Sequence, residues 1–330
     1  MTHFRFLSWA AAVAFTLGST LAVAAPTVFI PLGAGNQVIA VDAATHRITA
    51  RFTGVVNAHG LVITPDGEYL VAGSLQETTL PAGSPPSAPD SKLYLIHPAH
   101  GHVMSTIAVS GWTHHQTITP DGRYVISTHP TRGGISVADL QTNQVVHTIK
   151  TGPVPNTTVV TRDGKQAFVT NSGNGTISQI DLSSWKVTRQ LEGGPAPEHL
   201  VMSGDEKTLY ALNASAGTVS VVAVATGKVV QTHKLGTKLH GLDIGDDGQT
   251  LFVTDRSANK LLALNLRDGT QRAIDLAPAP YHLNTIRGTG KVYVTSSSNP
   301  IVWVVDQKTL AVTGTIALPA GVGHQMAVMP

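Results

Sequence analysis

The sequence repeats itself with a period of 42 residues over most of its length, and this period constrains the fold more than any other feature. Each repeat contains a short turn built on Asp-Gly or a similar pair. The first residues of these turns are Asp66, Asp121, Asp163, Asp205, Asp247 and Thr289. The first step along this series is 55 residues long, and each later step is 42 residues long. Such regularity is typical of chains that repeat one supersecondary unit many times.

The repeating unit is built from strands. Residues 199–235, for example, read HLVMSGDEKTLYALNASAGTVSVVAVATGKVVQTHKL. Runs of Val, Thr, Tyr and Leu alternate with polar residues and are separated by Gly, Asn and Asp, which is the pattern of short strands joined by tight turns. Four strands in a repeat of this length make one blade of a β-propeller.

The two ends of the chain are expected to share one blade. One step of 42 residues back from Asp66 reaches residue 24, and one step beyond Thr289 reaches position 331. Residues 25–56 therefore supply three strands of a blade and residues 324–330 supply the fourth, which removes two open sheet edges. The predicted fold is all-β, a seven-bladed β-propeller of four-stranded antiparallel blades that forms one domain over residues 25–330.

Three segments resemble the YVTN-type repeats of exported bacterial seven-bladed β-propellers. They read AFVTNSGNGTISQIDLSSWKV, LFVTDRSANKLLALN and VYVTSSSNPIVWVVD. The resemblance covers essentially the whole chain after residue 24 and implies the same seven-bladed fold. It does not select a function, because propellers host many different activities.

Residues 1–24 are expected to be a secretory signal peptide. Arg5 supplies a positive charge, an apolar stretch follows, and Ala22-Val23-Ala24 matches an A-x-A-like cleavage site. The alternative is an uncleaved membrane anchor, which the Gly-Ser-Thr sequence at residues 18–20 disfavours. No later stretch is long and apolar enough to span a bilayer. We therefore expect a periplasmic or secreted protein without a membrane span after cleavage.

Composition excludes several kinds of site. The chain has no Cys, so it has no disulfide, no thiolate metal site and no Cys nucleophile. Its net charge is +2, only 13% of its residues are charged, and no basic patch is interleaved with aromatic residues. We therefore expect no nucleic-acid partner. We expect a monomer with a substantial core, because 42% of the residues are hydrophobic.

Histidines recur at one position of the repeat. The position seven residues before each turn holds His59, His114, Asn156, Glu198, His240, His282 and His324. Five of these seven residues are His, although His accounts for only 15 of the 330 residues. His115 and His199 follow one residue later in their repeats. In the resembled fold this position begins the innermost strand of each blade, so these side chains are expected to form a ring at one mouth of the central channel.

Such a ring favours a transition-metal site over the alternative, in which each polar residue caps a turn or binds water in the channel. Imidazole suits copper, zinc, nickel and iron(II), and it suits calcium and magnesium poorly. The expected ligands are His59, His114, His240, His282 and His324, with His115 and His199 as further candidates. We expect a copper ion first and a zinc ion second, and four ligands are enough for a typical zinc site.

A tight hairpin at each turn predicts partners for these ligands. It would place the residue seven before the turn opposite the residue eight after it, and thus Asp255 opposite His240 and His129 opposite His114. Ligating histidines often donate their second ring N–H to such neighbours. The residues expected around the ligands are Asp255, His129, Asn156 and Asn171. The alternative role for Asp255 is to cap a turn at the end of its strand.

The long first step contains an insertion of 13 residues, the difference between 55 and 42. It lies in the Pro/Gly/Ser-rich stretch LQETTLPAGSPPSAPDSK, residues 75–92. Because the stretch follows Ser74, it is expected to leave from the same mouth as the histidine ring. It is either a lid or docking loop, or a surface insertion without a role.

Three functions remain open at this stage. The His114-His115 pair and the ring resemble the copper-binding propeller of nitrous oxide reductase, which implies copper held by histidines. The lack of Cys, and Asn156 and Glu198 at two ring positions, argue against that enzyme's reaction. The first hypothesis is therefore capture, storage or delivery of copper or zinc, with a periplasmic protein as a partner. The second is a metal-dependent hydrolase or lyase with Glu198 as general base. The third is a scaffold that binds a protein, a peptide or a tetrapyrrole.

Overall fold

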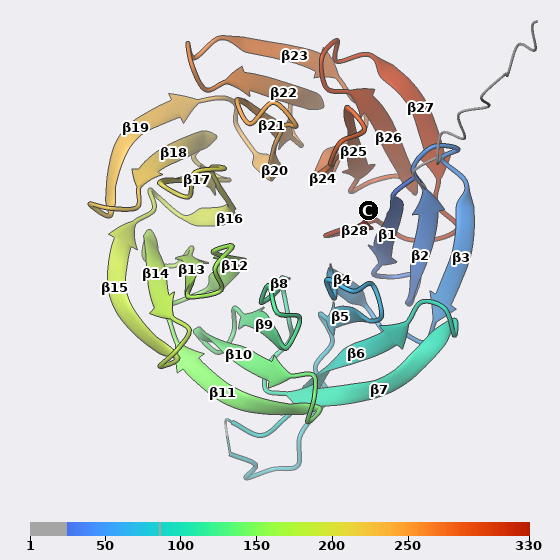
Figure 1. The fold of residues 1–330 in the computed structure, drawn as a ribbon, viewed down its shortest axis with the longest axis vertical. Coiled ribbons are helices and arrows are strands. Elements are labelled where there is room, and N and C mark those ends of the chain that lie inside the picture. Colours follow the sequence, from blue (N-terminus) through green and yellow to red (C-terminus); the bar gives the residue numbers. More distant parts are fainter. Residues whose placement is uncertain (1–24, 86) are drawn as a thin grey trace, which may run out of the picture.

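Seven four-stranded antiparallel sheets surround a common axis in the computed structural model (Figure 1). The structure describes residues 25–85 and 87–330, so the expected signal peptide, residues 1–24, lies outside the described residues. The predicted fold class, an all-β propeller with seven blades, is confirmed.

The first blade combines both ends of the described chain. Its strands are β1 (Thr27–Leu32), β2 (Gln37–Asp42), β3 (Ile48–Thr53) and β28 (Ala327–Met329). Ala327 pairs with Phe29 and Met329 pairs with Thr27, so β28 is the innermost strand of this blade. The predicted joint between the two ends of the chain is therefore confirmed, and it closes the ring through main-chain hydrogen bonds.

The other six blades each run from an inner strand to an outer strand. The second contains β4 (Ala58–Ile63), β5 (Leu70–Ser74), β6 (Ser91–His97) and β7 (His102–Val109). The third contains β8 (Gln116–Ile118), β9 (Tyr124–His129), β10 (Gly134–Asp139) and β11 (Gln144–Lys150). The fourth contains β12 (Pro155–Val160), β13 (Gln166–Asn171), β14 (Thr176–Asp181) and β15 (Lys186–Glu192).

The last three blades follow the same order. The fifth contains β16 (Pro197–Met202), β17 (Thr208–Asn213), β18 (Thr218–Ala223) and β19 (Lys228–Lys234). The sixth contains β20 (Leu239–Ile244), β21 (Thr250–Asp255), β22 (Lys260–Asn265) and β23 (Gln271–Asp275). The seventh contains β24 (Pro280–Ile286), β25 (Lys291–Ser296), β26 (Ile301–Asp306) and β27 (Val312–Ala317).

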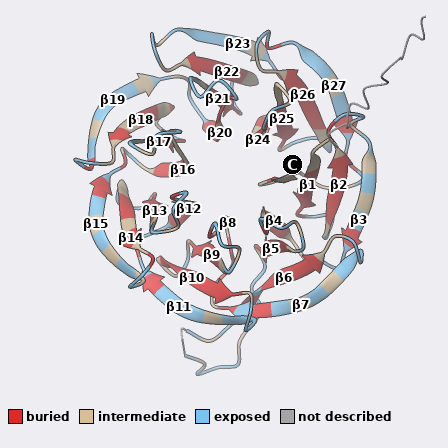
Figure 2. Cartoon of the chain, in the orientation of Figure 1, coloured by how far each residue is buried: buried red, intermediate tan, exposed pale blue. Residues whose placement is uncertain are grey.

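The hydrophobic core lies between adjacent blades. Phe29 and Phe52 of the first blade, for example, pack in one cluster with Leu70 and Tyr94 of the second. The second and third strands of each blade are therefore almost wholly buried, whereas the outermost strands alternate between exposed and partly buried residues (Figure 2). Within the described part of the chain, no helix has the length and apolar character that crossing a bilayer requires.

The repeated Asp-Gly turns close the first hairpin of the blades. Asp66 accepts hydrogen bonds from the Thr64 hydroxyl at 2.5 Å and from the Glu68 main-chain N–H at 3.0 Å. Gly67 has φ of +75°, a conformation that glycine adopts without steric cost. These local requirements explain why the same pair of residues recurs along the sequence.

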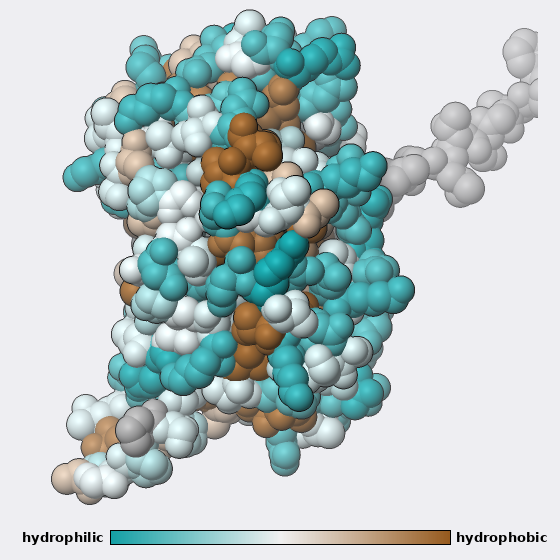
Figure 3. Space-filling view, turned by 90° about the vertical axis from the view of Figure 1, so that its left-hand side faces the viewer, coloured by the Kyte–Doolittle hydropathy of each residue, from teal (hydrophilic) through white to brown (hydrophobic). Residues whose placement is uncertain are grey.

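The insertion connects β5 to β6 and is held at its base by the third blade. Asp90 accepts hydrogen bonds from Arg132 at 2.5 Å and from the Gly111 N–H at 2.6 Å. Glu77 accepts a hydrogen bond from the Trp112 N–H at 3.0 Å. The loop extends outward past β11, away from the axis, and projects beyond the body of the molecule at the lower left of Figure 3 (Figures 1 and 3). In this structure it does not cover the centre of the ring.

Candidate metal centre

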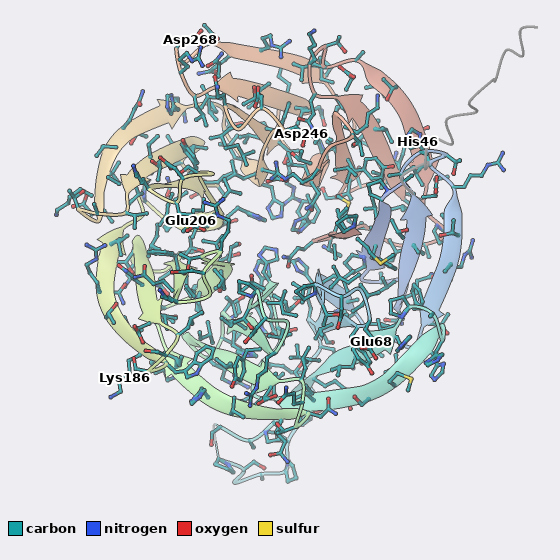
Figure 4. The ribbon with its side chains drawn as sticks, in the orientation of Figure 1. His46, Glu68, Lys186, Glu206, Asp246 and Asp268 are labelled. Carbon is teal, nitrogen blue, oxygen red and sulfur yellow. The ribbon has the colours of Figure 1, made fainter. Side chains whose placement is uncertain are left out.

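Seven histidine side chains gather at the propeller axis. They are His59 in β4, His114 and His115 before β8, His199 in β16, His240 in β20, His282 in β24 and His324 before β28. Nitrogen-bearing side chains converge at the centre of the ring in Figure 4. The structure thus brings together the five histidines of the predicted ring and the two further candidates.

A β-bulge places two consecutive residues of an inner strand at the axis. In β20, Leu239 pairs with Asp255 and Leu242 pairs with Val253, so β20 has one residue more than its partner over this stretch. Similar shifts occur in β4, β12, β16 and β24. A bulge interrupts the alternation of side chains and re-aims them. Before β8, the His114 N–H donates to the Thr128 carbonyl oxygen and the Thr128 N–H donates to that of His115, so both histidines lie opposite one residue and both can enter the cluster.

The pairing of the seventh blade corrects the predicted position of His282. Pro280 pairs with Ser296 as Leu239 pairs with Asp255, so the step between these blades is 41 residues rather than 42. Tyr281, not His282, is therefore the structural equivalent of His240. His282 belongs with His115 and His199, one residue further along the inner strand.

Six of the seven histidines form three overlapping groups of three, and His240 adjoins these groups through His282, whose Nε2 lies 3.3 Å from Nε2 of His240. Within each group, one ring nitrogen from each residue lies within 4.8 Å of the others. The groups are His59, His114 and His115; His59, His282 and His324; and His115, His199 and His282. Each pair of groups shares one histidine, so the three groups form one continuous cluster.

Ring contacts show how tightly the cluster is packed. The His59 ring lies 4.3 Å from the His324 ring and 4.5 Å from the His114 ring, measured between centroids. The His115 ring lies 4.9 Å from the His199 ring. His59, His115 and His199 are less than a tenth exposed. These three rings are thus largely shielded from water, whereas His114 and His324 are only partly buried.

Two glycines allow the inner strands to approach closely beside these rings. A Cβ on Gly60 would lie 2.0 Å from Oε1 of Gln116 and 2.7 Å from the carbonyl oxygen of His114. A Cβ on Gly241 would lie 2.6 Å from the carbonyl oxygen of Tyr281. In β4 and β20 the residue after the histidine must therefore be glycine.

Several ring nitrogens in the cluster have no hydrogen-bond partner although they are buried. They are Nδ1 of His114, Nε2 of His115, Nε2 of His199 and Nδ1 of His324. An unsatisfied buried polar atom is costly, and a native structure that contains one calls for an explanation such as a bound ion. Four such nitrogens in one cluster fit a metal site.

Hydrogen bonds orient two of the rings. Nδ1 of His59 lies 3.0 Å from the carbonyl oxygen of His114, which can only accept, so this nitrogen carries the hydrogen. Nε2 of His59 therefore keeps its lone pair for a ligand. Nδ1 of His115 lies 2.9 Å from Oγ1 of Thr157, which leaves Nε2 of His115 free to face the cluster. Such partners fix the tautomer of a ligating histidine.

Burial keeps the cluster uncharged. It lowers the pKa of His199 to about 3 and the pKa values of His114 and His324 to about 4. Burial also holds the pKa well below its usual range for His59, His115, His240 and His282. Repulsion between neighbouring imidazolium charges is a further cause at these four residues. The rings are thus neutral near pH 7, which is the form that binds a metal.

The predicted pairing behind the cluster is wrong. Asp255 lies opposite Leu239 and Asn171 lies opposite Pro155, one residue before the expected partner, because the bulge shifts the register. Asp255 caps its own turn, since it accepts hydrogen bonds from the N–H groups of Ser257 and Ala258. It also accepts one from the N–H of Thr237 before β20. The turn-capping role, which the sequence left as the alternative, is the one that the structure has.

Of the other three residues expected around the ligands, two lie inside their own blades and one lies at the cluster. The ring nitrogens of His129 contact the Gly111 carbonyl oxygen and the Ser136 hydroxyl, so His129 belongs to its blade and not to the cluster. Asn171 donates to Ser178 at 2.9 Å inside the fourth blade. Asn156 does lie at the cluster, where it opposes the lowering of the His114 pKa.

A group of polar and aromatic side chains from the fifth, sixth and seventh blades adjoins the cluster. Tyr281 stacks on His240 with ring centroids 4.0 Å apart and an interplanar angle of 10°. Arg256 lies over the Tyr281 ring, 4.8 Å from its centroid. Burial raises the pKa of Glu198, and the charge of Arg256 opposes this shift. Tyr281 was not among the site residues predicted from the sequence. Aligning Tyr281-His282-Leu283 with Glu198-His199-Leu200 places Tyr281 at the same position of the repeat as Glu198.

Comparisons with known sequences identify a propeller relative for part of the chain. A family model described as a YNCE-like beta-propeller matches residues 92–204, from β6 to just past β16. No curated protein sequence matches the chain.

Solved structures of low sequence identity have the same fold. Hydrazine synthase of Kuenenia stuttgartiensis is 17% identical with a TM-score of 0.73, over 90% of this chain and 100% of that one. The periplasmic gluconolactonase of Pseudomonas aeruginosa is 18% identical with a TM-score of 0.74, over 92% and 99%. A dihydro-heme d1 dehydrogenase in complex with DHE is 14% identical with a TM-score of 0.67, over 89% and 64%.

Proposed function

We propose that this protein is an exported transition-metal-binding propeller that captures, stores or delivers copper, with zinc as the second choice. The observation that carries the proposal is the set of three overlapping histidine groups with nitrogens within 4.8 Å of one another. Export to the periplasm is part of the proposal and rests on the signal-like residues 1–24.

The number of ligands supports more than one metal ion. A tetrahedral structural site uses four protein ligands, whereas seven histidines line this cluster. His59, His115 and His282 each belong to two of the three groups, so neighbouring ions would sit side by side. We therefore propose a site for two or more ions.

The ligand chemistry supports copper over zinc. All seven candidate ligands are neutral imidazoles, a ligand type that suits copper, zinc, iron and nickel. For a given nitrogen site, the affinity of divalent first-row metals rises to copper and falls again at zinc. Calcium and magnesium prefer carboxylate ligands. In the described part of the chain, none of the three groups contains a carboxylate.

Elemental analysis of protein purified without a metal-affinity tag tests the proposal. We expect stoichiometric copper or zinc in the wild-type protein and a loss of most of it in the His240→Ala/His282→Ala double variant. The matched control is His233→Ala, because His233 lies on the outer strand β19. Undiminished metal content in the double variant would show that these rings are not ligands. A visible absorption spectrum of the same sample separates copper from zinc and also detects a bound tetrapyrrole.

A second candidate function is metal-dependent hydrolysis, which one observation favours. Glu198 adjoins His199, and its burial raises its pKa, as expected for a general base that works near neutral pH. The likeness in fold to a gluconolactonase makes glucono-lactone the first substrate to try. Turnover by the metal-loaded protein that disappears in the Glu198→Gln variant would favour this function over storage. The absence of turnover with full metal content would exclude it for this substrate.

A further inference from the structure

His240 and Arg256, both from the sixth blade, each contact the Tyr281 ring at the edge of the histidine cluster. The His240 ring lies parallel to the Tyr281 ring, with centroids 4.0 Å apart. The guanidinium carbon of Arg256 lies 4.8 Å from the centroid of the Tyr281 ring, within the range of a cation–π contact. Arg256 is exposed, Tyr281 is partly buried, and His240 is buried. The contacts at Tyr281 therefore lie where the candidate metal centre meets solvent.

The guanidinium of Arg256 has no acidic partner in the part of the chain that the structure describes. The ion pairs found there use other cations. The neighbouring carboxylate, Asp255, accepts hydrogen bonds from the N–H groups of Ser257 and Ala258 in its own turn and of Thr237. Glu198 is close enough to affect the electrostatics but forms no ion pair with Arg256. The planar group keeps its N–H donors available for a ligand.

The positive charge of Arg256, which has no acidic partner among the described residues, favours the binding of an anion at this edge of the centre. A histidine binds a metal ion as a neutral imidazole, so the charge of an ion held by this cluster is not balanced by its ligands. Arg256 adds a further positive charge, and it contacts the same Tyr281 ring that His240 contacts. Two positive charges at close range repel each other in a partly desolvated site. An anion between them would relieve this repulsion.

We propose that a small carboxylate ligand binds at this edge of the cluster, between the guanidinium of Arg256 and a metal ion at His240. This inference rests on the proposed metal site and adds a class of ligand to it. Arginine presents two parallel N–H groups that match the two oxygens of a carboxylate. Tyr281 holds the guanidinium plane in position, and the metal ion supplies the second contact.

Titration of the copper-loaded protein with formate tests this inference. We expect formate to bind the wild-type protein, as followed by calorimetry and by a change in the copper(II) absorption spectrum. In the Arg256→Gln variant we expect the affinity for formate to fall at least about tenfold, because the charge-assisted pair is lost. The copper content of this variant should be unchanged, since Arg256 is not among the histidine groups.

Two controls make the result specific. Arg267→Gln removes an exposed arginine on the far side of the same blade, after β22, and should leave the affinity for formate unchanged. Tyr281→Leu keeps the charge of Arg256 but removes its platform, and should weaken formate binding to an intermediate degree. Equal formate affinity in wild type and Arg256→Gln, at equal copper content, would overturn the inference.

The metal proposal and the anion proposal fail in different ways. Wild-type protein that takes up no copper would show that the metal proposal is wrong. Formate titration of that metal-free protein then decides whether Arg256 binds the anion by itself. Formate binding that is just as tight without copper as with it would show that the anion does not contact the metal.

Discussion

His240 and His282 meet at the propeller axis with their Nε2 atoms 3.3 Å apart, although 42 residues separate them in the sequence. Two nitrogens bound to one tetrahedral zinc ion at about 2.0–2.1 Å lie roughly 3.3 Å from each other. The spacing of these two side chains therefore equals the spacing that a shared metal ion requires. In the metal-free protein, one ring must donate a hydrogen bond to the other to hold this contact.

Replacing Thr157 by Val should weaken metal binding without disrupting the blade. The hydroxyl of Thr157 lies 2.9 Å from Nδ1 of His115 and orients this ring. Loss of such a partner commonly lowers metal affinity by roughly 10–100-fold. Competition with a chromophoric copper chelator measures the change. Thr158→Val is the matched control, because the Thr158 hydroxyl is buried without a partner, and an equal loss in both variants would contradict the prediction.

The metal-free protein should lose stability as the pH falls below about 6.5. The folded-state pKa of His199 is about 3 and those of His114 and His324 are about 4, below the ordinary value of 6.5. Between these values the unfolded chain binds more protons than the folded one. The free energy of unfolding then decreases by up to about 1.4 kcal/mol per pH unit for each such histidine.

Urea denaturation at pH 7.5 and at pH 5 checks this pH dependence. The slope of stability against pH should be smaller in the His199→Gln variant, which removes one of the depressed groups. A metal-free protein that is equally stable at both pH values would show that the cluster histidines are not held neutral by the fold.

Gly60→Ala should destabilise the protein and disturb the cluster. The added Cβ would lie 2.7 Å from the carbonyl oxygen of His114, which main-chain packing holds in place. Overpacking of this kind typically costs about 1–3 kcal/mol of unfolding free energy. Thermal unfolding measures the cost. Gly204→Ala provides the comparison, because a Cβ on Gly204 would contact nothing within 4 Å, and it should change stability by less than about 0.5 kcal/mol.

Asp90→Asn should loosen the insertion but leave metal binding intact. Asp90 is 6% exposed and accepts hydrogen bonds from Arg132 and from the Gly111 N–H, so removing its charge weakens the base of the loop. We expect a loss of about 1–3 kcal/mol of stability and faster proteolysis within residues 75–90. Copper content should stay at the wild-type level, because the loop extends away from the axis. A loss of copper would mean that the insertion does support the site.

The architecture was predictable because every blade repeats the same strands and turns, and these depend on residues that are close together in the sequence. The Asp66-Gly67 turn and its equivalents are set by side chains two to four residues away, so the period is visible in the sequence. The shared first blade followed from counting that period to both ends. The identity of the histidines at the axis was predictable for the same reason, since the start of each inner strand is a fixed place in the repeat.

The partners of those histidines were not predictable from spacing alone. A bulge of one residue places Asp255 opposite Leu239 rather than His240. The pairing of β22 with β23 lacks the one-residue bulge that the outer hairpins of the other blades contain, and this places Tyr281 where His282 was expected. Both are shifts of a single residue, and a single residue exchanges one face of a strand for the other. An average period cannot resolve such shifts.

The sequence by itself determined the number of blades, the joint between the chain ends and the set of histidines at the axis. These follow from strand patterning and turn chemistry, which act over short distances along the chain. Only the tertiary structure decided which histidines share a centre. His59 and His324 have rings 4.3 Å apart because β28 pairs with β1 and closes the ring. Distances across the axis depend on the packing of seven sheets at once, and no local pattern encodes them.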